Sequence, residues 1–155
     1  MILRRNRGEA SILGDTMNLN HPVIPLLGRL LIAYIFVTSG IAKVFDWSGN
    51  VAYMSTRHLA YIPVLLAVAT VIELGGSLCL VTGYQARLAA FVMCLYMIAV
   101  TVLFHNYWAA SPTIAGMQET HFRKNLAIMG GLLMLAYCGP GEWSLGKRIG
   151  KPRIA

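Results

Sequence analysis

The most restrictive feature of the sequence is an uninterrupted run of seventeen uncharged residues at positions 88–104. A helix that crosses the hydrocarbon core of a bilayer needs about 20 predominantly apolar residues, so this run is a candidate membrane span. Residues 22–44 and 61–82 have the same character, each with one charge deep inside the segment. Only 12% of the 155 residues are charged and 57% are hydrophobic, whereas a soluble domain has about 25% charged residues. The chain is therefore predicted to be a membrane protein.

A fourth apolar run, at residues 125–138, is short enough to be a buried core helix that does not cross the membrane. The basic residues decide the number of crossings, because clusters of Lys and Arg mark cytoplasmic segments. Both ends of the chain carry such a cluster, so the number of crossings must be even. The sequence thus predicts an all-α membrane protein, a four-transmembrane-helix bundle with cytoplasmic N and C termini. The predicted spans are 22–44, 61–82, 87–105 and 121–138, and the clusters are Arg4, Arg5 and Arg7 and Lys147, Arg148, Lys151 and Arg153.

The same topology assigns the connections to the two sides of the membrane. The short turn at 83–87 is expected in the cytoplasm, and the connections at 45–60 and 106–120 in the periplasm. The second of these contains Pro, Gly, Ser and Thr and is expected to be a surface loop. Met17 is an alternative start of the chain. The predicted organisation is a cytoplasmic tail at 1–21, a membrane domain at 22–141 and a basic cytoplasmic tail at 142–155.

Neither a nucleic-acid partner nor a secretory signal agrees well with the basic and apolar segments. The net charge of +7 lies mainly in the tails and forms no basic stripe interleaved with aromatic residues, which argues against a nucleic-acid partner. A secretory signal would place its apolar stretch directly behind the basic start. Polar residues intervene here, among them Glu9, Asn18 and His21, so the first span is expected to be retained.

The charges inside the spans predict which helix faces point inward. A charge in hydrocarbon is costly unless it is paired or faces a polar interior. At about 100° per residue, each span gathers its charged and small residues on one seam. The predicted seams are Arg29, Ala33, Phe36, Gly40 and Lys43; Leu66, Ala69, Glu73 and Gly76; Arg87, Cys94, Ile98, Thr101 and His105; and Lys124, Gly131, Leu135 and Cys138.

Among the charged residues inside the spans, Glu73 is the most informative, because it lies near the middle of its span. Arg29, placed at a comparable depth in the first span, is its expected partner in an intramembrane ion pair. Such a pair can lock two helices together. The alternatives are a role in carrying a proton or binding a ligand, and a contact with lipid or a partner protein.

A second polar group is expected at the periplasmic end, where helix ends converge. Lys and His donors there can bind an anionic head group or a quinone carbonyl. The alternative is ordinary anchoring at the membrane interface by lysine and histidine side chains. The candidate ligand or quinone site consists of Lys43, His105, Asn106, Lys124 and Asn125, with Asp46, His58 and His121 nearby.

The metal-binding residue types do not form a recognisable metal motif. His105 is the only histidine firmly on a predicted seam, whereas a haem or metal site would need imidazoles opposed across the bundle. Cys79, Cys94 and Cys138 fall one per span without close spacing and are expected to be packing residues. No metal and no intrinsic cofactor is therefore predicted.

Several short segments, taken in order, resemble the DoxX family of small four-helix bacterial inner-membrane proteins over about residues 28–148. Their order and spacing carry the resemblance rather than any one of them. One departure lies at 58–63, H-L-A-Y-I-P, where many members place Gly two residues before the proline. The matching segments are G-R-L-L at 28–31, S-G-I-A-K-V-F-D at 39–46, E-L-G-G at 73–76, the turn at 83–87, F-H-N-Y-W at 104–108, F-R-K-N-L at 122–126, the glycine pair at 130–131 and G-P-G at 139–141.

The resemblance implies a multi-pass protein of the bacterial inner (plasma) membrane, and it leaves the chemistry open. Some members resemble the membrane subunit of a thiosulfate to quinone oxidoreductase, and others accompany redox enzymes. The first hypothesis is accordingly a redox-associated, quinone-linked subunit without stand-alone catalysis, with the lipid bilayer, a redox partner protein and further copies of itself as partners. The alternatives are transport of a small solute or proton through Arg29 and Glu73, and a purely structural membrane role.

Overall fold

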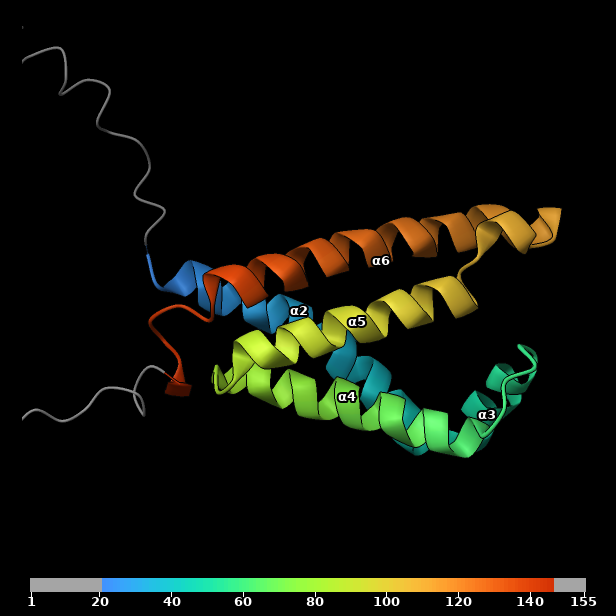
Figure 1. Ribbon diagram of the computed structural model, residues 1–155, viewed down its shortest axis with the longest axis horizontal. Coiled ribbons are helices and arrows are strands. Elements are labelled where there is room, and N and C mark those ends of the chain that lie inside the picture. The colour runs from blue at the N-terminus through green and yellow to red at the C-terminus, as the bar shows by residue number, and fades with distance from the viewer. Residues whose placement is uncertain (1–20, 147–155) are drawn as a thin grey trace, which may run out of the picture.

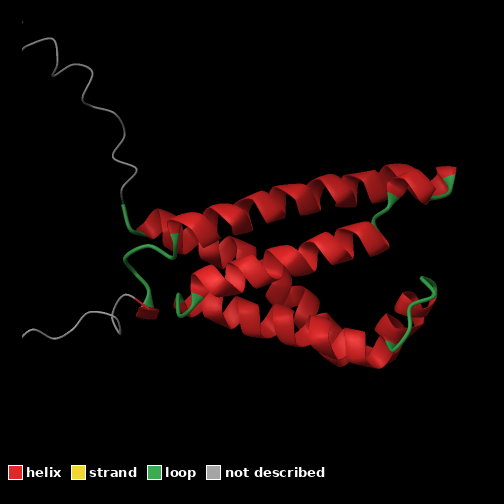
Figure 2. Ribbon diagram, viewed as in Figure 1, coloured by secondary structure: helices red, strands yellow, loops and turns green. Residues whose placement is uncertain are grey.

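The computed structural model describes residues 21–146, and all regular elements in that range are helices (Figures 1 and 2). The basic clusters of both tails, the alternative start at Met17 and most of the two predicted tail segments lie outside the described residues. The elements are α2 (Val23–Phe45), α3 (Trp47–Ser55), α4 (Ile62–Thr82), α5 (Ala86–Phe104), the single 3₁₀ turn η1 (Tyr107–Ala109) and α6 (Pro112–Cys138).

The four long helices run roughly along one axis, and α2 packs mainly on α4, α4 on α5, and α5 on α6 (Figure 1). Contact between α2 and α6 is much less extensive. Both ends of the described chain leave at the same end of the bundle, which we call the closed end. The opposite end, where α3 lies, is called the cavity end.

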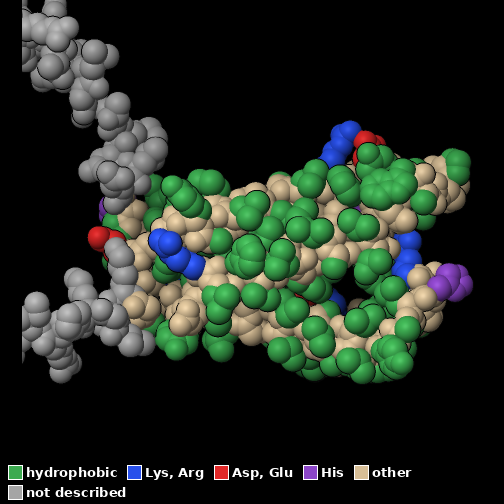
Figure 3. Space-filling model, in the orientation of Figure 1, with side chains coloured by type: hydrophobic (Ala, Val, Ile, Leu, Met, Phe, Trp, Pro, Cys, Tyr) green, Lys and Arg blue, Asp and Glu red, His purple; other side chains and the backbone are tan. Residues whose placement is uncertain are grey.

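Three of the helical segments are long and apolar enough to cross a membrane: Val23–Phe45, Ile62–Thr82 and Ala86–Ala109. Their hydrophobic side chains cover much of the outer surface (Figure 3), which is the arrangement expected of helices that face lipid rather than water. The helical membrane fold predicted from composition is therefore confirmed for these three segments. α6 is longer, and the polar residues in its first half keep it outside this group.

Two connections contain more helix than the sequence analysis predicted. α6 begins at Pro112, nine residues before the expected start of the fourth span, so the expectation of a surface loop at 106–120 is wrong over most of its length. Proline needs no intrahelical donor at the first helical position, so it suits a helix start. In the 45–60 connection, Asp46 ends α2 and caps α3, where its Oδ1 accepts a hydrogen bond from the Gly49 N–H at 3.1 Å.

The close packing of α2 on α4, and of α4 on α5, depends on small residues. A Cβ atom added at Gly40 of α2 would lie 2.7 Å from Cδ2 of Leu74 in α4. A Cβ added at Gly76 of α4 would lie 2.5 Å from the sulfur of Met93 in α5. Glycine at these positions lets the helix backbones approach where no hydrophobic force between helices is available inside lipid. The helix register across α2 and α4 is thereby fixed.

The predicted inward seams agree with the observed buried residues in some helices better than in others. In α2 the prediction is confirmed, since Arg29, Ala33, Phe36 and Gly40 are the buried residues. In α6 the prediction is confirmed for Leu135, which is buried, and wrong for Lys124 and Cys138, which are exposed. The other buried residues of α6 are Gln118 and Leu132. The reason is that α6 packs mostly on α5 alone, so its inward stripe is set by that single contact.

The α5 seam is partly confirmed. Thr101 and Cys94 are buried as predicted, whereas Ile98 and Arg87 are exposed. In α4, Leu66 and Glu73 are buried. Sequence periodicity therefore locates the inward face best where a helix has close neighbours.

Candidate functional site

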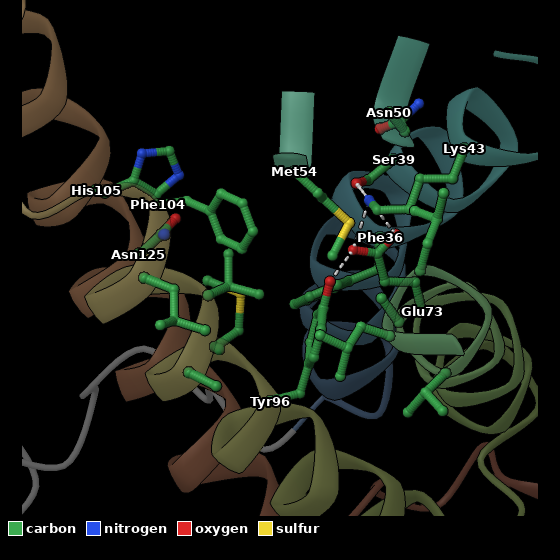
Figure 4. A pocket seen from close by; sticks show the side chains of 18 of the residues that line it. Phe36, Ser39, Lys43, Asn50, Met54, Glu73, Tyr96, Phe104, His105 and Asn125 are labelled. Atoms are coloured by element: carbon green, nitrogen blue, oxygen red, sulfur yellow. Dashed lines mark hydrogen bonds and ion pairs between the residues drawn. The ribbon is translucent and has the colours of Figure 1, made fainter. Parts of the chain in front are cut away.

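The centre of the site is the carboxylate of Glu73, the twelfth of 21 residues in α4 and only 3% exposed. Its two oxygens lie 2.9 Å and 2.8 Å from Nζ of Lys43 in α2. The hydroxyl of Tyr96 in α5 donates to Oε1 at 2.6 Å. Three helices thus converge on one carboxylate, as Figure 4 shows. We call Lys43, Glu73 and Tyr96 the polar triad.

Lys43 has a further partner on its own helix. Its Nζ donates to Oγ of Ser39 at 2.6 Å, because residues four apart on a helix lie on the same face. The side chain of Lys43 retains 17% exposure, compared with 5% for that of Glu73. The cation is therefore the more accessible member of the ion pair.

The predicted ion pair between Arg29 and Glu73 is wrong. Gly40 lies opposite Glu73 and Leu74, and Arg29 is eleven residues before it, which corresponds to about 16 Å along the helix. Arg29 instead donates from Nη1 to the carbonyl oxygen of Leu80 at 3.1 Å and from Nη2 to that of Trp143 at 2.5 Å. Arg29 therefore links elements at the closed end, and the partner of Glu73 is Lys43.

The polar triad lies in the wall of a cavity of 410 Å³ between α2, α3, α4, α5 and α6. This volume falls in the range of pockets that hold small molecules, about 300–1,000 Å³. Figure 4 shows Met54 and Phe104 pointing into the same space as the triad. The walls are mostly apolar, with Phe36, Met54, Leu59, Leu66, Val100, Leu103 and Phe104 among the lining residues.

Polar side chains line the part of the cavity toward α6. Asn125 of α6 donates from Nδ2 to Oγ1 of Thr101 at 3.0 Å. His105 lies at the end of α5, where its Nδ1 is 2.9 Å from Oε1 of Gln118, and its ring stacks on that of His121 with centroids 5.0 Å apart. Both His105 and Asn125 line the cavity, so the predicted histidine and amide lie where a ligand can reach them.

Of the five predicted ligand residues, Lys43, His105 and Asn125 line one cavity. The other two do not. Lys124 is exposed on α6, because its position is one residue away from the inward stripe. Asn106 accepts a hydrogen bond from Nη1 of Arg57 at 3.4 Å and belongs to the connection after α5.

Of the three nearby residues in that prediction, none lines the cavity. Asp46 caps α3. His58 lies in the exposed turn that follows α3, where its φ is 52°. His121 reaches the site only through its ring contact with His105.

Three residues of the site, Tyr96, Ser39 and Gln118, are not among those predicted from the sequence. Tyr96 was hidden inside the most apolar run of the chain, and a hydroxyl in the middle of such a run is a signal that could have been used. Ser39 precedes Lys43 by four residues, a spacing that places both on one face. Gln118 lies in the segment expected to be a loop, so no helical face was assigned to it.

Metal-ligating residues do not cluster in the described range. Among residues 21–146, no group of three or more His, Cys, Asp or Glu side chains is placed to hold a metal ion. Cys94 is buried, Cys79 is half-buried and Cys138 is exposed, and all three are free thiols. The chemistry available in the cavity is thus that of an ammonium group, a carboxylate, hydroxyls, an imidazole and an amide.

These observations define a class: a helical membrane protein with a charged, hydrogen-bonded group beside a largely apolar cavity. A family model described as DoxX matches residues 24–106. The chain therefore belongs to the DoxX family, and it is an integral inner-membrane protein, as the resemblance implied.

Two relatives in Escherichia coli (strain K12) match over nearly their whole lengths. The chain is 34% identical over 128 residues to inner membrane protein YphA, which is 82% of this chain and 91% of YphA. It is 30% identical over 126 residues to inner membrane protein YqjF, which is 81% of this chain and 92% of YqjF.

A more distant relative is eukaryotic. The ER-derived vesicles protein ERV29 of Saccharomyces cerevisiae is 30% identical over 121 residues, which is 78% of this chain and 32% of ERV29. No solved structure matches the chain.

Proposed function

We propose that this protein is a quinone-binding membrane subunit that supports a redox process in the inner membrane and has no stand-alone catalysis. In this proposal α6 is the fourth transmembrane helix. The basic tails place both termini in the cytoplasm by the positive-inside rule, so the cavity end faces the periplasm. The exit of both described chain ends at the closed end supports an even number of crossings.

The observation that carries the proposal is the polar triad beside an apolar cavity. A quinone is a flat apolar ring with carbonyl oxygens that need donors, and the cavity offers apolar walls together with the Nζ of Lys43 and the hydroxyl of Ser39. A buried ion pair costs desolvation free energy that a well-packed apolar pair would not. Retaining one beside a cavity is consistent with a role in binding.

The triad also contains groups that can exchange protons with a bound quinone. Reduction of a quinone to the quinol takes up two electrons and two protons. Lys43, Tyr96 and Glu73 are linked by hydrogen bonds and can pass protons to the ring oxygens. In this proposal the electrons come from a redox partner protein, since the reduction of a quinone needs an electron donor.

The proposal is tested by measuring the quinone that co-purifies with the protein in mild detergent. Tyr96→Phe removes one hydroxyl from the triad and leaves the ring, so it should lower the bound quinone several-fold while the protein remains folded. Tyr34→Phe is the matched control, because Tyr34 is 68% exposed on the outside of α2. Equal quinone content in both variants, or none in the unaltered protein, would contradict the proposal.

A second candidate function is proton or solute transport, favoured by the position of the ion pair in the middle of α4. Charged side chains within a membrane span commonly mark ion or proton pathways. In this version Lys43 replaces Arg29 as the partner of Glu73. Glu73→Gln in proteoliposomes should then abolish a proton flux that the unaltered protein supports, and an unchanged flux excludes this candidate.

A further inference from the structure

The cavity owes its shape to the way α4 and α5 diverge. The two helices are joined by a tight turn in which Gly83 and Gln85 both have left-handed backbone conformations, with φ of 74° and 48°. From this turn at the closed end they spread apart toward the cavity end (Figure 1). The cavity is lined by the half of each helix remote from the turn, including Leu65 and Val68 of α4 and Ala99 and Leu103 of α5.

Several residues of α4 and α5 that line the cavity have large exposed fractions. Leu65, Val68 and Leu103 have exposed fractions of 41%, 50% and 43%. By contrast, Leu66 and Met97, which line the cavity from the inside of the same two helices, are 1% and 5% exposed. The wall between α4 and α5 is therefore incomplete. Figure 3 shows the surface hollowed at this place, with charged side chains at the bottom of the hollow.

The edges of this lateral slot are made of hydrocarbon side chains. Leu65, Val68, Ala99 and Leu103 carry no side-chain polar atom, and they belong to two helices with the length and hydropathy of membrane spans. A slot of this composition in a membrane-spanning segment faces acyl chains rather than water. At the cavity end, near the connections, the lining includes the polar residues His105 and Asn50; we call this part of the cavity rim the other opening.

We propose that the ligand enters from the bilayer through this slot. In the bound state its polar head lies at Lys43, Glu73 and Tyr96, and its hydrocarbon tail lies in the slot. The inference rests on the proposed function and names the ligand class more narrowly: a lipid-soluble molecule with a long apolar chain, such as a quinone with an isoprenoid or alkyl tail. A tail in the slot remains in contact with lipid, so the head can bind without the whole molecule leaving the membrane.

The test compares two quinones with the same ring, one with a ten-carbon alkyl tail and one without a tail. The protein is placed in lipid nanodiscs, and the bound quinone is measured in competition with empty nanodiscs. Val68→Trp should obstruct the slot and weaken binding of the tailed quinone at least tenfold, while the tail-less quinone, which can pass the other opening, should lose less than twofold.

Val71→Trp is the matched control. It makes the same change on the same helix, at a residue that is 70% exposed and does not line the cavity. Equal binding of the tailed quinone to both variants and to the unaltered protein would contradict the proposed slot, but it would not contradict the proposed quinone site. Failure of the unaltered protein to bind either quinone would overturn the proposed function and the slot together.

A second measurement does not depend on the Trp variants. A quinone with a photoreactive azide at the end of its alkyl tail is bound to the unaltered protein, and the crosslinked residues are mapped. The slot predicts labelling of Leu65, Val68 or Leu103. Labelling confined to the α3 side of the cavity, at Asn50 or Leu59, would show that the tail takes the other opening and would contradict the proposal.

Discussion

The two ends of the bundle both use an arginine that donates to backbone carbonyl oxygens, yet they are packed very differently. At the closed end, Arg29 is 1% exposed and links the end of α4 to the segment after α6. At the cavity end, Arg57 is half-buried and donates to the carbonyl oxygen of Phe104 at 3.1 Å. The first arginine is embedded in the fold, whereas the second holds α3 beside a cavity.

The closed end is reinforced by a second contact of the same kind. Arg87 donates from Nη2 to the carbonyl oxygen of Cys138, the last residue of α6, at 3.2 Å. Carbonyl groups at a helix C-terminus lack intrahelical partners, and a basic side chain can satisfy them. The comparison indicates that the closed end fixes the helices relative to one another, whereas at the cavity end they enclose an open space.

The largest effect is expected for Arg29→Ala. It leaves one buried and one partly buried carbonyl oxygen without their charged donor and creates a space in the core, so the free energy of unfolding should fall by about 4 kcal/mol. Thermal unfolding in detergent, followed by circular dichroism, measures the change. A loss no greater than that of Arg57→Ala would abolish the distinction between the two ends.

Glu73→Gln should come next, with a loss of about 3 kcal/mol, because it leaves Lys43 as an unpaired cation beside the cavity. Lys43→Gln in the same chain should restore part of that loss. The double variant should therefore be more stable than the sum of the two single changes predicts, by about 1–2 kcal/mol. Strict additivity would show that the pair contributes nothing specific to the fold.

The packing of the first three long helices predicts a difference between two adjacent glycines. Gly76→Ala should lower the free energy of unfolding by about 1–2 kcal/mol, because the new methyl group meets the side chain of Met93. Gly75→Ala is its control, since nothing lies within 4 Å of a Cβ added there. Equal stability of the two variants would mean that helix spacing here tolerates a methyl group.

Arg57→Ala should cost only about 1 kcal/mol, since its hydrogen bonds join half-buried groups. Its main effect should be on ligand exchange: without the hydrogen bonds from the turn after α3 to Phe104 and Asn106, a tail-less quinone should enter and leave several-fold faster. Stopped-flow measurement of quinone release gives the rate. Arg123→Ala is the control, because Arg123 is exposed on α6 and pairs only with Glu119 among the described residues. An unchanged rate would separate Arg57 from access to the cavity.

The smallest expected effect is a gain. Tyr61 is 82% exposed and has a φ of 55°, in the left-handed region that disfavours residues with a Cβ. Tyr61→Gly should raise the free energy of unfolding by about 0.5 kcal/mol, whereas Tyr61→Ala, which keeps the Cβ, should not. It is also the position, two residues before Pro63, at which many DoxX members place glycine. If Ala stabilises as much as Gly, the backbone conformation is not the cause.

The seam of α2 shows how much of the site could be predicted from residue order. The spacing of Arg29, Phe36 and Gly40 predicts the buried face of that helix, and three of the residues predicted to bind a ligand, Lys43, His105 and Asn125, line one cavity. In α6 the spacing is wrong for Lys124 and Cys138, which are exposed. A single helix contact can rotate the inward stripe by one residue, and the sequence contains no local signal for that rotation.

Residue order alone predicts the class of protein, the three apolar helices and the burial of each intramembrane charge, because hydrocarbon imposes these requirements on every segment separately. The pairing of Glu73 with Lys43, and not with Arg29, follows from the packing of the helices. That choice depends on how far α2 slides along α4, and the close approach of Gly40 to Leu74 sets this register. Pairing between helices is a property of their packing, and no spacing within one helix encodes it.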